Sequence, residues 1–370
     1  MGLLAARPRR WTRRALVGLF AGPVFSATRG KGFAPDWQRF SDPATELEVY
    51  RLTNPAYATF LPAYYNRAVS RKGQFLLCWS DRTGSPQAFR LNLKSGEWTQ
   101  VTDAESLDGS SLTLMPDEHS FCFFDGPSFK RVDFSRLRER EIYRVPEGWQ
   151  HCPGASVSDD GLYAVFVERQ RDVSRLRLVT MVRGAAATLA ESPWEMHEPM
   201  ANPRRTQVLY RQADEALWLV NFDGQQNRRL KIAVGGLGPA RWAPDGRTVL
   251  YLHLPVQKNE LNTLREHTPD ENLDKAVAKT SQFVHFDGNH DTSVFVGASR
   301  NKASPHILLL LRATQRELTL CEHRASDPTK VAPIFSANSQ QVFFQSDKNG
   351  KTAIYRVAVE RFVAETESES

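Results

Sequence analysis

The chain has 370 residues, of which 41% are hydrophobic, and a formal net charge of +6 at pH 7. Five arginines near the N-terminus (residues 7, 9, 10, 13 and 14) carry most of this charge, and subtracting them leaves the chain near +1. A chain without a basic face elsewhere is a poor candidate for nucleic-acid binding. The length suits one large domain built by repetition better than two ordinary domains.

Residues 1–27 resemble an export signal. Basic residues precede an apolar stretch over residues 15–25, and small residues follow at Ser26-Ala27. The run from Thr12 to Val17 is similar to a twin-arginine signal, with a Sec signal or a misplaced start codon as alternatives. We therefore predict a protein exported to the bacterial periplasm, with a cytoplasmic location as the alternative. The apolar stretch is too short to span a membrane, and we expect no membrane span elsewhere.

A unit of about 45 residues recurs seven times along the rest of the chain, a period typical of β-propeller blades. Each copy opens on a small or acidic turn and continues into an apolar strand. The turns lie at Lys72-Gly73, Pro116-Asp117, Asp160-Gly161, Asn202-Pro203, Asp245-Gly246, His290-Asp291 and Asn338-Ser339. We therefore predict an all-β fold, a seven-bladed β-propeller over residues 45–359.

Strand-forming runs rich in β-branched and aromatic residues follow the turns in chain order. They cover residues 75–79, 121–124, 163–167, 208–210, 249–252, 294–296 and 342–344. In the fifth unit, the polar stretch from Gln257 to Lys279 interrupts this pattern. We expect a surface loop there, or alternatively a lid.

The two ends of the repeat are complementary. The last unit ends at residues 357–359 without an outer strand, whereas an unpaired strand over residues 47–53 precedes the first unit. We predict that this N-terminal strand completes the last blade, because closing the ring removes exposed sheet edges. Residues 360–370 are acidic and are predicted to form a disordered tail.

The innermost strands of the blades should line a central channel where a ligand could bind. They are expected near residues 64–67, 110–112, 154–156, 197–199, 240–242, 284–286 and 332–335. Their cationic and aromatic side chains suit an anionic sugar, because guanidinium groups pair with carboxylates and rings stack on sugars. Ordinary packing between blades is the alternative. The candidate substrate-binding residues are Arg67, Arg82, His197 and Trp242.

Several stretches, in order and at matching spacing, resemble the oligogalacturonate lyase family. They are residues 51–53, 66–93, 145–149, 217–224, 285–291, 296–297 and 341–347, so the similarity runs over about residues 45–358. The resemblance implies a seven-bladed propeller that cleaves pectin-derived oligogalacturonides by β-elimination. In that reaction a base removes the C5 proton while a cation neutralises the adjacent carboxylate.

The resemblance also implies a divalent metal, typically manganese (Mn2+), held by histidines and a glutamine. His285 stands at one metal-binding position. Lys330 and Ala332 stand at two further histidine positions, and Asp327 lies near the glutamine position. Only one of the expected ligands is therefore retained, whereas metal sites normally use three or four protein ligands.

The resemblance further implies a histidine base and a neighbouring arginine, which this chain replaces by Pro239 and Ala216. A further histidine position holds Arg211. Proline cannot accept a proton, so the chemistry has either moved to other residues or been lost. The candidates that remain for catalysis, among them histidines that titrate near neutral pH, are His285, His290, Arg241, Arg211 and Lys330.

Two hypotheses follow. The first is a carbon–oxygen lyase with a rebuilt site, acting on oligogalacturonides or a related uronate oligosaccharide. The second is a non-catalytic periplasmic propeller that binds a sugar or a protein partner, in the manner of TolB-like repeats. A hydrolase carried on the same scaffold is a third alternative, although the sequence lacks a Gly-x-Ser-x-Gly elbow, a His-Glu-x-x-His pair and a phosphate-binding glycine loop. The sequence does not predict an oligomeric state.

Overall fold

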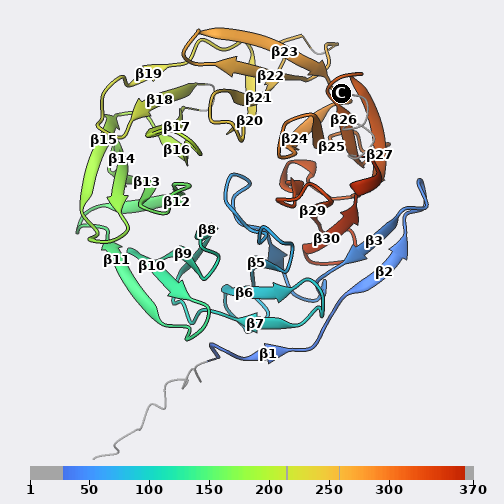
Figure 1. The fold of residues 1–370 in the computed structure, drawn as a ribbon, viewed down its shortest axis with the longest axis horizontal. Coiled ribbons are helices and arrows are strands. Elements are labelled where there is room, and N and C mark those ends of the chain that lie inside the picture. The colour runs from blue at the N-terminus through green and yellow to red at the C-terminus, as the bar shows by residue number, and fades with distance from the viewer. Residues whose placement is uncertain (1–27, 214–215, 258, 363–370) are drawn as a thin grey trace, which may run out of the picture.

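The computed structural model describes residues 28–213, 216–257 and 259–362. Seven antiparallel sheets surround a central channel (Figure 1). The seven-bladed propeller is therefore confirmed. The export signal predicted over residues 1–27 lies outside the described residues, as do residues 363–370 of the predicted tail. Within the described part of the chain, no helix is long and apolar enough to cross a membrane.

Blades 2 to 6 each contain four strands, which follow one another from the channel to the outside. Blade 2 contains β8 (Leu107–Leu114), β9 (Ser120–Asp125), β10 (Ser128–Asp133) and β11 (Glu139–Arg144). Blade 3 contains β12 (Gln150–Val157), β13 (Tyr163–Gln170), β14 (Val173–Thr180) and β15 (Ala186–Ser192). Blade 4 contains β16 (Met196–Ala201), β17 (Gln207–Gln212), β18 (Leu217–Asn221) and β19 (Arg228–Arg229). Blade 5 contains β20 (Gly236–Trp242), β21 (Val249–Leu254), β22 (Thr263–Thr268) and β23 (Leu273–Lys279). Blade 6 contains β24 (Phe283–Gly288), β25 (Val294–Ser299), β26 (His306–Leu311) and β27 (Arg316–Glu322).

Blades 1 and 7 have five strands each. Blade 1 contains β4 (Thr59–Phe60), β5 (Phe75–Ser80), β6 (Gln87–Asn92), β7 (Trp98–Gln100) and the outer strand β1 (Gly32–Phe33). Blade 7 contains β28 (Ile334–Phe335), β29 (Gln341–Ser346), β30 (Ala353–Ala358), β3 (Glu48–Arg51) and the outer strand β2 (Gln38–Ser41). Because β3 pairs with β30, the N-terminal strand closes the ring as the sequence predicts. A short 3-10 helix, η1 (Pro328–Lys330), precedes β28.

The N-terminal segment also holds the seam between blades 7 and 1 from outside, which the sequence does not predict. Its strand β1 pairs with blade 1 and its strand β2 with blade 7 (Figure 1). Between the two strands, Asp36 forms an ion pair with Arg82 of blade 1. The Arg82 guanidinium lies over the rings of Phe33 and Trp98, at 4.6 and 5.6 Å from their centroids. We call this segment, residues 32–41, the strap. Arg82 therefore binds the strap to blade 1 and does not face the channel.

The core consists of seven hydrophobic clusters, one between each pair of neighbouring blades. The second strand of each blade supplies residues to both of its neighbours, because side chains alternate between the two faces of a strand. In β5, for example, Leu76 and Cys78 pack against blade 7, whereas Phe75 and Leu77 pack against blade 2. This alternation explains why the second strands are almost continuously apolar and easy to find in the sequence.

The expectation of a loop or lid over residues 257–279 is wrong for most of that stretch. It forms β22 and β23, the two outer strands of blade 5. Outer strands are only half buried, so they carry charged residues that pair with one another. Arg265 contacts Asp274 within the blade at 2.6 Å, and Glu266 contacts Arg312 of blade 6 at 2.7 Å. The polar composition belongs to an exposed sheet surface.

Candidate functional site

A loop over residues 61–67 enters the central channel and closes it. The innermost strand of blade 1 is β4, so the expectation of an inner strand at residues 64–67 is wrong: the chain turns there instead. Figure 1 shows this loop in blue inside the ring. Its Leu61 amide donates to Gln345 of blade 7 at 2.9 Å, and the Asn66 side chain donates to the Ser110 carbonyl of blade 2 at 3.0 Å.

The same loop reaches the four remaining blades. Arg67 forms an ion pair with Asp159 of blade 3. Tyr64 extends across the channel: its hydroxyl lies 3.0 Å from the Glu198 carboxylate of blade 4 and 2.9 Å from the Ala240 carbonyl of blade 5. Its ring packs edge-on against the His285 imidazole of blade 6, with centroids 4.8 Å apart. One short loop therefore contacts all six other blades.

The loop lies between two cavities that open toward opposite ends of the inner strands. The large cavity has a volume of about 750 Å³ and is lined by the first residues of β20 and β24. The small cavity has a volume of about 190 Å³ and is lined by the last residues of the same two strands. The polar and charged side chains of the large cavity are Tyr64, Glu198, Arg211, Asn262, His285, Arg300, Lys302, Ser326, Asp327 and Thr329.

Arg211 is the buried cation of the large cavity. It projects from β17, and its guanidinium donates to the carbonyls of Leu237 and Gly238 at 2.8 and 3.3 Å. It also forms an ion pair with Glu198 at 3.3 Å. These contacts fix the orientation of a guanidinium group at the wall of the cavity, where a ligand carboxylate would meet it.

Two more cations stand at the mouth of the large cavity. Arg300 and Lys302 follow β25 on an exposed hairpin and line the cavity. Neither has an ion-pair partner among the residues that the structure describes. Asp327, which also lines the cavity, is paired with Lys330 at 3.5 Å. Arg300 and Lys302 are therefore available to an anionic ligand.

His285 is a neutral imidazole held inside the site. It projects from β24 and is only 5% exposed. Burial, and secondarily the nearby Arg241 charge, lower the pKa of His285 to about 3. Its buried Nδ1 has no hydrogen-bond partner within the described parts of the chain. A base this weak does not match proton abstraction near neutral pH.

The site does not fit the manganese that the resemblance implies. No group of three or more His, Cys, Asp or Glu side chains among the described residues is placed to hold a metal ion. At the expected ligand positions, Lys330 carries a positive charge and Ala332 has no ligating atom. His285 remains as a single imidazole, and one imidazole does not hold a divalent ion tightly.

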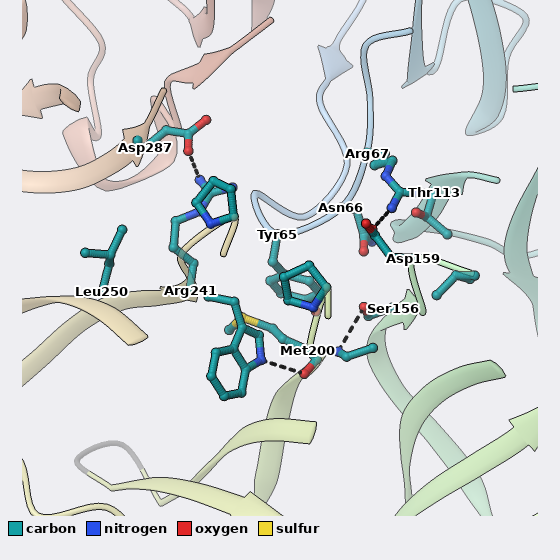
Figure 2. Close-up of a pocket in the computed structure, with 16 residues that line it drawn as sticks. Tyr65, Asn66, Arg67, Thr113, Ser156, Asp159, Met200, Arg241, Leu250 and Asp287 are labelled. Atoms are coloured by element: carbon teal, nitrogen blue, oxygen red, sulfur yellow. Dashed lines mark hydrogen bonds and ion pairs between the residues drawn. The ribbon is translucent and has the colours of Figure 1, made fainter. Parts of the chain in front are cut away.

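Three of the predicted residues line the small cavity instead: Arg67, Arg241 and Trp242. Figure 2 labels Arg67 and Arg241 at this cavity. Arg241 forms an ion pair with the buried Asp287. Burial raises the pKa of Asp287, although Arg241 opposes this shift. The Trp242 indole donates to the Met200 carbonyl at 3.3 Å. Since Arg67 is also paired with a carboxylate, the charges of this cavity compensate one another.

The remaining predicted residues lie elsewhere. His290 sits on the turn after β24, where its amide and Nδ1 contact the Ser339 hydroxyl at 3.1 and 3.0 Å. His197 lies on β16, opposite Arg211 in the strand register. Lys330 ends η1 beside the large cavity. The structure therefore brings Arg211 and His285 into one cavity with Lys330 alongside, and separates them from Arg241 and His290.

Sequence reasoning missed the roles of Tyr64, Glu198, Arg300 and Lys302. Glu198 lies in a bulge of β16 with a left-handed backbone, φ 50°. The bulge of β12, one repeat earlier, holds Gly154 at φ 97°. The bulge of β20 has the same length as that of β16, and it holds Gly238 where β16 holds Glu198. A glutamate where the next blade has glycine is a signal that could have marked this site.

Comparisons with known proteins agree with this fold. A family model described as oligogalacturonate lyase matches residues 27–176. An oligogalacturonide lyase of Pectobacterium atrosepticum is 24% identical and an oligogalacturonate lyase of Dickeya dadantii 22% identical, each over 90% of this chain and 98% of the relative. A solved oligogalacturonate lyase in complex with manganese matches with a TM-score of 0.84 and 22% identity, over 90% of this chain and 98% of that one. The chain is therefore similar to oligogalacturonate lyases over nearly its whole length, and it shares their fold.

Proposed function

We propose that this protein binds pectin-derived oligogalacturonides in the large cavity, and does so without manganese. The observation that carries the proposal is the set of cations Arg211, Arg300 and Lys302 around a cavity of about 750 Å³. This volume is in the range of sites for small ligands. With the export signal predicted over residues 1–27, we place this binding in the bacterial periplasm.

The charges of the cavity match the chemistry of an oligogalacturonide, which carries one carboxylate on every sugar. Arg300 and Lys302 stand at the mouth and Arg211 lies deeper, so successive carboxylates can meet successive cations. Guanidinium groups bind carboxylates in a bidentate manner, and such charge-assisted hydrogen bonds are about twice as strong as neutral ones. A neutral galactose oligomer would lose these contacts.

Manganese-dependent elimination has no support from this site. The relatives' name implies a lyase, and one solved relative contains manganese. In this chain Pro239, Lys330 and Ala332 occupy the positions expected for a base and two ligands, and no three His, Cys, Asp or Glu side chains among the described residues are grouped to hold a metal ion. The substrate class therefore carries over to our proposal, but the metal does not.

Calorimetric titration with trigalacturonate in the presence of EDTA tests the proposal. We expect binding by the wild-type protein, and a loss of affinity of at least about tenfold in the double variant Arg300→Ala/Lys302→Ala, since each tenfold corresponds to about 1.4 kcal/mol. The matched control is Arg39→Ala/Lys94→Ala, which removes two exposed cations from the outer edges of the ring. No binding by the wild type, or equal binding of neutral galactotriose, would overturn the proposal.

A further inference from the structure

We infer that Glu198 and Tyr64 form an acid–base pair that eliminates the glycosidic bond of a bound oligogalacturonide without a metal ion. This inference rests on the proposed binding of uronate oligosaccharides in the large cavity. It names two catalytic residues, and a route without a metal ion, that the comparison with relatives does not assign.

The geometry of the pair is the first support. The Tyr64 hydroxyl and the Glu198 carboxylate lie 3.0 Å apart, and both groups line the large cavity. The Tyr64 hydroxyl also lies 2.9 Å from the carbonyl of Ala240, which directly follows Pro239. Pro239 stands where the resemblance implies a base, and proline cannot accept a proton. Tyr64 and Glu198 therefore supply proton-transferring groups beside that position.

The backbone of Glu198 is the second support. Its left-handed conformation, φ 50°, is strained for a residue with a side chain, and Gly154 serves the corresponding bulge of blade 3. Such a conformation persists where the surrounding contacts hold it. Here the surroundings are the Tyr64 hydroxyl and the Arg211 guanidinium, which hold the carboxylate from two sides.

The loop that carries Tyr64 is the third support. It contacts all six other blades, among them Gln345 of blade 7 and Ser110 of blade 2 through hydrogen bonds of 2.9 and 3.0 Å. A hydroxyl held from several sides needs little reorganisation when it transfers a proton. Burial, and then the Glu198 charge, raise the pKa of Tyr64 well above its ordinary value, so the hydroxyl carries its proton at neutral pH.

The reaction balances within this pair. The Glu198 carboxylate takes the C5 proton of a galacturonate, and the electron pair of the C5–H bond forms the C4=C5 double bond. The bond between C4 and the glycosidic oxygen breaks, and this oxygen takes its proton from the Tyr64 hydroxyl. The proton on Glu198 then passes to Tyr64 along their hydrogen bond, which restores both groups. Arg211 neutralises the uronate carboxylate while the C5 proton leaves.

The test measures turnover and binding on the same full-length protein. The ultraviolet absorbance of the unsaturated product reports turnover of trigalacturonate in EDTA, and calorimetry reports its binding. We expect wild-type turnover, and a fall of at least about 100-fold in both Glu198→Gln and Tyr64→Phe. Their affinity for trigalacturonate should stay within about threefold of the wild type, because neither change removes a cation. The matched control is Tyr65→Phe, which alters the neighbouring tyrosine on the side of the small cavity.

A further variant separates catalysis from folding. In Glu198→Gly the relief of the left-handed backbone opposes the loss of the contacts with Tyr64 and Arg211, so its melting temperature should stay within about 5 °C of the wild type while turnover is lost. Binding without any turnover by the wild type would overturn the inference and leave the proposed function intact. Absence of binding would overturn the proposed function itself. Turnover that EDTA abolishes, or that survives both Glu198→Gln and Tyr64→Phe, would also overturn the inference.

Discussion

The Tyr64 hydroxyl and the Glu198 carboxylate lie 3.0 Å apart, although they come from blades 1 and 4 on different sides of the ring. The contact exists because the chain leaves β4 and crosses the channel before it returns to β5. The loop thereby divides the channel into a large cavity with cations available to a ligand and a small cavity with compensated charges.

The first prediction concerns this loop. Tyr64→Ala removes the ring that packs against His285 and Tyr65, together with the hydrogen bonds of the hydroxyl. We expect the free energy of unfolding to fall by about 3 kcal/mol, the usual loss for truncating a large packed aromatic residue. Tyr64→Phe, which keeps the ring, should lose only about 1 kcal/mol. Urea unfolding measures both, and equal stabilities of Tyr64→Ala and the wild type would contradict a packed loop.

The second prediction concerns pH. The pKa of His285 in the folded protein is about 3, whereas an unfolded histidine titrates near its ordinary value. The unfolded state therefore binds more protons as the pH falls below neutrality, and this lowers the stability of the fold. Between about pH 7 and pH 5 the loss from this one residue should be about 2 kcal/mol. In His285→Phe, urea unfolding across that range should show a shallower dependence on pH, and an unchanged slope would contradict the assignment.

The third prediction concerns the strap across the seam. Arg82 has a side chain only 15% exposed, is paired with Asp36 and lies over three aromatic rings. Arg82→Ala leaves the Asp36 charge without its partner, so we expect a loss of about 2 kcal/mol. The control is Arg39→Ala, because Arg39 pairs with Glu48 while its side chain is 67% exposed. The free energy of unfolding of Arg39→Ala, measured by thermal unfolding, should fall by less than about 0.5 kcal/mol. Equal losses in the two variants would show that the contacts of Arg82 stabilise the fold no more than an exposed ion pair does.

The fourth prediction concerns metal ions. A ligand that binds the folded state raises the melting temperature by mass action. Because no three His, Cys, Asp or Glu side chains among the described residues are grouped to hold a metal ion, neither manganese nor EDTA should shift the melting temperature of the wild type. A rise with manganese that disappears in His285→Ala would show that His285 binds a metal after all.

Most of the fold could be predicted from the sequence because the second strand of every blade is buried on both faces. Strands such as β5 and β9 are therefore apolar at all positions but their ends, and they follow their turns at a fixed spacing. The unpaired strand before the first unit likewise revealed how the ring closes. Elements without this burial were missed: β1 and β2 are short and mostly exposed, and the charged outer strands β22 and β23 were taken for a loop.

The candidate site could be predicted only in part, because a sequence does not show at which end of the channel a side chain lies. Arg211 and Arg241 come from neighbouring blades, yet they line different cavities. The aromatic pair Tyr64-Tyr65 looked like part of a strand, since nothing local marks a loop that is stabilised by contacts with distant blades. Arg300 and Lys302 were overlooked because exposed charges on hairpins are common, and only their position at the cavity mouth distinguishes them.

The most direct test of the account is a crystal structure of the metal-free protein with trigalacturonate. We predict the sugar in the large cavity beside Tyr64, with its carboxylates on Arg300 and Lys302 and no metal ion between the sugar and His285. A sugar bound in the small cavity beside Trp242, or a metal ion bridging the sugar and His285, would contradict it.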